Sequence, residues 1–142
     1  MSVVLLRAKN IFDMIMSFEV NDNMNLSCLQ SEFNKLFPYL KLEFYEKDGA
    51  NNKKIIQKTI YNNSRILGEF KNSSVSKPIV IIPEMTVQEL SDNFNQQYSL
   101  SPKVFRRSGN VWLSTSVTDG WSLQEQNKQG ELITAQMADS KL

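Results

Sequence analysis

The chain has 142 residues, and its 16 basic and 15 acidic side chains leave a net charge of +1. This length fits one domain around one core, and the near-neutral balance provides no global field that would attract nucleic acid or an anionic membrane. Histidine is absent and Cys28 is the single cysteine, which excludes a disulfide within the chain, a zinc site of cysteine and histidine ligands, and nucleophile pairs that rely on histidine.

The N-terminal segment carries a short apolar run, Val3 to Leu6, that is broken at once by Arg7. It is too short and too charged for a signal peptide or a membrane span. With one cysteine and no export signal, we expect a cytoplasmic protein that has no membrane partner. Residues 1–13 fit an added strand, an arm or an upstream start equally well.

The first organised unit is a strand, a helix and a second strand. Residues 15–20 alternate between apolar and polar side chains, as a half-buried strand does. Residues 26–37 carry one apolar stripe at helical spacing, and Pro38 ends that helix. Residues 40–46, LKLEFYE, alternate again and predict the second strand.

The segment 47–76 is rich in Asn, Lys and Ser and has only modest apolar clusters. We expect an irregular connection that holds an edge strand or a short helix, with mobile turns near Gly49 and Ser73. The apolar run PIVII that follows, residues 78–82, predicts a central strand covered on both faces. A capping box at residues 86–89 then starts a second amphipathic helix, which runs to Tyr98.

A hairpin and a last helix complete the chain. The sequence KVFRR, SGN, VWLSTS predicts a three-residue loop at 108–110, where Gly109 supplies a positive φ. In that register Phe105 faces Leu113, Arg107 faces Val111, and Arg106 faces Trp112. Residues 122–125 form another capping box, and Gly130 is expected at the end of this short helix, with residues 131–142 as a loose tail.

The two strand–helix–strand units match when the sequence is shifted by 61 positions. The shift places Leu29 on Leu90 and Phe33 on Phe94, which suggests an internal repeat with halves at about 14–46 and 77–117. Two such units in one α+β domain over residues 1–142 resemble the ferredoxin-like fold, in which two helices cover one face of an antiparallel sheet. Residues 64–133 also resemble a ubiquitin-like β-grasp, and neither resemblance specifies a function.

No residue pattern indicates a catalytic, cofactor or metal site. Cys28 falls near the start of the first helix, Glu43 and Glu46 flank Tyr45 without a nucleophile nearby, and the five glycines are too scattered for a phosphate loop. We therefore expect no cofactor and favour a non-enzymatic protein, although carboxylate or lysine chemistry stays open.

The C-terminal hairpin is the one surface for which the sequence indicates a binding role, because arginine and tryptophan dominate protein-binding hot spots. Its candidate residues are Lys103, Arg106, Arg107, Trp112 and Trp121. We expect a protein interaction or assembly module that docks on a partner or on itself. The alternative is a single-stranded nucleic-acid binder, since bases stack on rings while cations hold phosphates.

Overall fold

The structure is a computed structural model that describes residues 16–48, 56–59, 64–72 and 77–140. Its smaller sheet is a two-stranded antiparallel ribbon of β1 (Phe18–Val20) and β4 (Ile79–Ile81). In this ribbon Glu19 lies opposite Val80. Residues 79–82 are all buried, as the apolar run predicted. The predicted central position is wrong, because β1 is the one strand that pairs with β4 in the described chain.

The larger sheet is antiparallel and has the strand order β3-β2-β5-β6. Its two long central strands are β2 (Leu40–Asp48) and β5 (Leu100–Ser108), which pair over seven residues from Leu40–Arg106 to Glu46–Leu100. The edges in the described chain are β3 (Ile56–Thr59) and β6 (Val111–Ser114).

Two helices of eleven residues, α3 (Leu26–Leu36) and α4 (Val87–Gln97), follow β1 and β4. Each begins at a side-chain cap, because the Asn25 Oδ1 accepts the Cys28 N–H and the Thr86 hydroxyl oxygen accepts the Glu89 N–H. A 3-10 helix, η1 (Leu67–Phe70), precedes β4. The last helix, α5 (Leu123–Asp139), is capped by Ser122.

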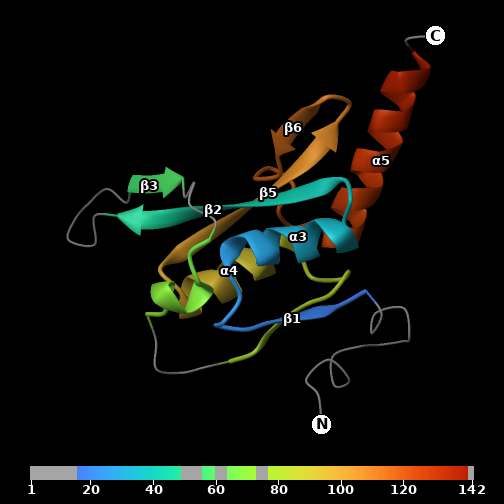
Figure 1. Cartoon of the computed structure of the whole chain (residues 1–142). Coiled ribbons are helices and arrows are strands. Elements are labelled where there is room, and N and C mark those ends of the chain that lie inside the picture. Colours follow the sequence, from blue (N-terminus) through green and yellow to red (C-terminus); the bar gives the residue numbers. More distant parts are fainter. Residues whose placement is uncertain (1–15, 49–55, 60–63, 73–76, 141–142) are drawn as a thin grey trace.

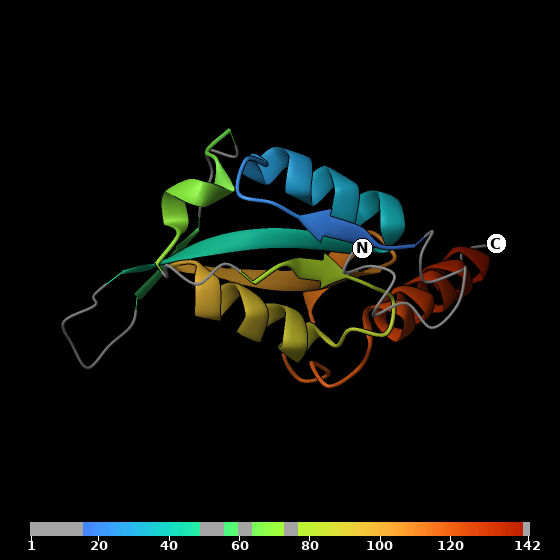
Figure 2. The same ribbon diagram turned by 90° about the horizontal axis from the view of Figure 1, so that it is seen from below.

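The helices α3 and α4 lie between the larger sheet and the β1/β4 ribbon (Figure 1). Seen from below, the ribbon runs between the two helices (Figure 2). The core fills the space enclosed by these layers, and the apolar stripes of both helices are buried in it. Phe94 of α4 links the helix layer to the sheet, since its ring centre lies 6.0 Å from that of Phe44.

The ferredoxin-like arrangement is not what the described residues form. Strands β1 and β4 pair with each other, as that fold requires, but β2 and β5 pair with each other in a separate sheet. The β-grasp alternative for residues 64–133 also differs, because β4 pairs with β1 and not with β5. The chain is therefore α+β with two antiparallel sheets.

The connection at 47–76 contains both elements that were alternatives, the edge strand β3 and the 3-10 helix η1. The expected turns near Gly49 and Ser73, and residues 1–13, lie outside the described residues. The expected loose tail from residue 131 is wrong, because α5 continues to Asp139.

Gly130 lies inside α5 and does not end it. A Cβ at this position would lie 3.0 Å from the Tyr39 Cβ, 3.1 Å from the Arg106 Cγ and 3.2 Å from the Arg107 carbonyl oxygen. The glycine therefore serves the close approach of α5 to β2 and β5, which the sequence pattern could not separate from a helix end.

Candidate interaction surface

The hairpin that carries the candidate residues has a two-residue loop, Gly109 and Asn110, between β5 and β6. Gly109 has a φ of +65° and no described non-glycine residue has a positive φ, which fits a type II′ turn. Ser108 therefore pairs with Val111, and the predicted register is wrong by one residue. Arg106 lies opposite Leu113, while Arg107 lies opposite Trp112.

This one-residue difference divides the candidate residues between two faces of the sheet, because successive side chains of a strand point to opposite faces. Arg106 shares the inner face with Val104, which is buried against the helices. Lys103, Arg107 and Trp112 belong to the outer face. The expected contact between Arg106 and Trp112 is therefore not formed.

On the inner face, Arg106 is held between α5 and the loop before it. Its guanidinium donates to the Gln126 Oε1 at 2.8 Å and lies 5.5 Å from the ring centre of Trp121. Gln126 is fully buried and donates its amide to both the Thr118 carbonyl and the Thr118 hydroxyl. Arg106 and Trp121 thus meet at the junction of β5, the 118–121 turn and α5.

On the outer face, lysines cover the aromatic rings. The Lys41 Nζ lies 5.2 Å from the ring centre of Trp112 and 5.6 Å from that of Phe105, and the Lys103 Nζ lies 4.8 Å from that of Tyr45. The sequence interpretation omitted Lys41, Tyr45 and Phe105. The alternation of LKLEFYE contained the signal for the first two, since it places Lys41 and Tyr45 together on the polar side of their strand.

A carboxylate and a carbonyl balance part of this positive charge. Glu43 forms an ion pair with Lys41 at 3.3 Å and accepts a hydrogen bond from the Tyr45 hydroxyl. At the loop end, the Arg107 Nε donates to the Gly109 carbonyl at 2.8 Å. Lys103 and Arg107 remain exposed to solvent.

The exposed large apolar side chains of the described chain are concentrated near this hairpin. Only Ile66 lies elsewhere. The others come from β6, the loop that follows it, and α5: Val111, Trp112, Leu113, Val117, Trp121, Leu132 and Met137. In Figure 1, α5 extends beyond the layers of the fold.

A hollow of about 310 Å³ lies between the hairpin tip and the end of α5. Its lining combines the turn with three α5 residues, Thr134, Met137 and Ala138. The Thr134 hydroxyl oxygen accepts the Gly109 N–H at 3.1 Å, so the helix and the hairpin tip are fastened together. We call β6, the loop with Val117 and Trp121, and the exposed side of α5 the hairpin surface.

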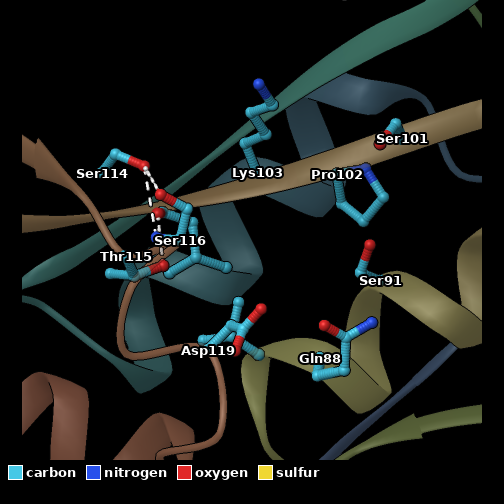
Figure 3. A pocket seen from close by; sticks show the side chains of 11 residues that line it. Gln88, Ser91, Ser101, Pro102, Lys103, Ser114, Thr115, Ser116 and Asp119 are labelled. Carbon is cyan, nitrogen blue, oxygen red and sulfur yellow. Dashed lines mark hydrogen bonds between the residues drawn. The ribbon is translucent and has the colours of Figure 1, made fainter.

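A second, smaller hollow of about 200 Å³ lies between the start of α4 and β5. Hydroxyl side chains from Ser91, Ser101 and Ser114 line it, and Asp119 supplies its carboxylate. Figure 3 shows the Lys103 ammonium pointing away from Asp119. Asp119 is the one carboxylate in this lining, so no two carboxylates converge in it.

A polar cluster elsewhere holds η1 and α4 to the turn after β1. Asp22 pairs with the Lys71 ammonium at 2.7 Å and accepts a hydrogen bond from the Tyr98 hydroxyl at 2.5 Å. The hydrogen bond from Lys71, followed by that from Tyr98, holds the pKa of Asp22 below its ordinary value of 3.8. Burial, together with the hydrogen bond to Asp22, raises the pKa of Tyr98 far above its ordinary range.

The described residues contain neither a cluster of metal ligands nor a membrane-spanning helix. No three His, Cys, Asp or Glu residues among them gather closely enough to hold a metal ion. None of the helices in the described ranges is long and apolar enough to cross a membrane. Comparisons of the chain with protein-family models, with curated proteins and with solved structures gave no match.

Proposed function

We propose that this protein is a non-enzymatic module that binds another protein through the hairpin surface. The observation that carries the proposal is the concentration of exposed apolar side chains there, seven between Val111 and Met137 against Ile66 elsewhere in the described chain. Exposed apolar patches mark surfaces that proteins bury against partners. Trp112 and Trp121 are also of the residue type most enriched in binding hot spots.

The chemistry of this surface favours a protein partner over nucleic acid. Val111, Leu113 and Leu132 are aliphatic, and such side chains neither stack with bases nor contact phosphates. Arg106 is already bonded to Gln126 and lies over Trp121. It therefore orders the surface from within.

We also propose that the two strand–helix–strand units are a tandem repeat. The repeat forms the scaffold, and the hairpin surface is added to it. Both central helices have eleven residues and begin 61 positions apart, at Leu26 and Val87. Two residues before each of them lies a methionine whose carbonyl accepts the first N–H of the helix that follows in the chain. Met24 accepts from Leu67 of η1, and Met85 accepts from Leu123 of α5, both at 2.8 Å. These matched contacts support a common scaffold, on which the second half carries the longer helix.

A pull-down from the source cells tests protein binding. The double variant Leu113→Lys with Trp121→Ser places polar groups at two exposed positions of the hairpin surface, so it should retain the fold and lose the partner. The matched control is Ile66→Lys, an exposed apolar position in the connection between the two halves. If the control and the double variant retain the same proteins as the native chain, and their melting curves coincide, the proposal is wrong.

A second candidate function rests on the outer face of the sheet, which overlaps the hairpin surface at Trp112. The outer face of the sheet presents three cations, Lys41, Lys103 and Arg107, among the rings of Tyr45, Phe105 and Trp112. Such a face can bind single-stranded nucleic acid. Fluorescence anisotropy with a labelled oligonucleotide should then show binding that weakens steeply with salt and is abolished by Lys103→Glu. An oligonucleotide that does not bind at low salt excludes this function.

A further inference from the structure

Strand β6 has an outward edge that the rest of the described chain leaves unpaired, because β5 is its one partner there. The Thr115 N–H donates to the Val104 carbonyl, and this bond fixes the phase of the ladder. In an antiparallel pair the backbone bonds alternate in direction along the strand. Val111 and Leu113 therefore bond towards β5, while the N–H and C=O groups of Trp112 and Ser114 point out of the sheet.

This edge lacks the features with which proteins prevent strand pairing. Its four residues, VWLS, include neither a charged residue nor a proline. The neighbouring edge of β5, beyond the end of β6, carries Pro102 at a position whose N–H would point outward. The opposite edge strand β3 carries Lys58. Within the larger sheet, β6 is thus the edge that lacks these features.

We propose that β6 pairs in antiparallel orientation with β6 of a second copy of this chain, so that the two four-stranded sheets become continuous. This inference rests on the proposed function and names its partner. A two-fold axis at Leu113 satisfies the outward groups, since Trp112 of one copy then exchanges both backbone hydrogen bonds with Ser114 of the other. The same exchange occurs on the other side of the axis.

The side chains suit this register on both faces of the sheet. On the inner face the two copies of Leu113 meet across the axis as a non-hydrogen-bonded pair, where side chains approach most closely. On the outer face each Trp112 lies beside a serine, and the two tryptophans lie diagonally across the axis, within the reach of aromatic rings.

The charges of the surface do not oppose this pairing. Of the outer-face cations, Lys41 reaches the ring of Trp112 but is paired with Glu43 at 3.3 Å. Lys103 and Arg107 lie on β5, so three strand spacings separate the β5 strands of the two copies. At about 4.8 Å for each spacing this is roughly 14 Å, which exceeds the screening length of about 8 Å at physiological ionic strength. The dimer therefore gains the apolar contact without close repulsion.

Sedimentation equilibrium of the full chain over a wide dilution series tests the proposal. The native mass should rise from 16.3 kDa towards twice that value with concentration. Leu113→Lys places two cations on the axis, and Ser114→Pro removes an outward N–H without disturbing the bonds to β5. Each should raise the dimer dissociation constant at least about tenfold. Leu132→Lys is the matched control, since Leu132 is 44% exposed and Leu113 is 45% exposed.

Amide exchange measured by NMR gives a second readout. The Trp112 and Ser114 amides should become protected as concentration rises, while protection of the Leu113 amide, which bonds to β5, should not change. A mass of 16.3 kDa at every concentration, or equal weakening by Leu132→Lys, overturns the dimer. A monomeric chain that still retains a partner sensitive to Leu113→Lys with Trp121→Ser overturns the second copy alone. A monomeric chain without such a partner overturns the proposed function as well.

Discussion

Replacement of Gln126 by methionine tests whether buried polar contacts hold the hairpin surface together. Gln126 is 0% exposed, accepts the Arg106 guanidinium at 2.8 Å, and donates to the Thr118 carbonyl at 2.7 Å and the Thr118 hydroxyl at 2.8 Å. A bond to a charged group contributes about 1.5–3 kcal/mol and a neutral bond about 0.5–1.5 kcal/mol. Because Arg106 and Thr118 are half-buried and can recruit water, we expect a loss near the lower limit of these three bonds, about 2.5 kcal/mol.

The assay is chemical unfolding followed by far-UV circular dichroism, with a thermal melt in which this loss lowers Tm by roughly 10 °C. Methionine keeps nearly the same volume, so the change reports the hydrogen bonds and not a cavity. Gln129→Met, which removes an exposed bond to Glu125, should stay within about 0.5 kcal/mol of the native protein. Equal stability of Gln126→Met and the native protein would refute the reasoning, and equal losses in both variants would assign the effect to the composition of α5.

Three further changes test the fold. The stability that Asp22 provides through Lys71 and Tyr98 should be complete above the ordinary carboxyl pKa of 3.8, and it should be lost as the pH falls through the lowered pKa of the folded state. Asp22→Asn should therefore reduce the fall of Tm at acid pH, and an unchanged fall contradicts the assignment. Gly109→Ala forces a Cβ onto a φ of +65°, 2.9 Å from the Met137 sulfur, and should cost about 1–2 kcal/mol in urea unfolding; a neutral result would mean that the turn can change its type. Phe33→Ala empties a fully buried position beside Phe37 and should cost about 3–5 kcal/mol in the same assay, whereas a loss below about 1 kcal/mol would show that this helix is not part of the core.

The helices could be predicted from sequence because their signals are local. A cap side chain, an apolar stripe and a stop residue lie within one short segment, and they placed α3 and α4 to within a residue or two. The burial of β4 could also be predicted, from the apolar run PIVII. The glycine of the hairpin turn was identified for the reason that applies in the structure, its positive φ.

The candidate residues were less predictable, because the face to which a strand side chain points depends on the number of residues in the adjoining loop. A loop of two residues, where three were expected, moved Trp112 from opposite Arg106 to opposite Arg107. Arg106 then joined Trp121 and Gln126 on the inner face. Lys41 reached Trp112 from a strand more than sixty positions earlier in the chain, a contact that only strand pairing could create.

By itself, the sequence determined which segments become helices and strands and which of their sides are apolar. Periodicity records the burial of a side chain, but it does not record which strand lies beside it. Only the tertiary structure decided that β2 and β5 pair with each other in a separate sheet and not with β1 and β4. The physical reason is that both arrangements bury the same apolar sides. The choice between them depends on how the whole core packs, and that choice leaves β6 at the edge of the sheet.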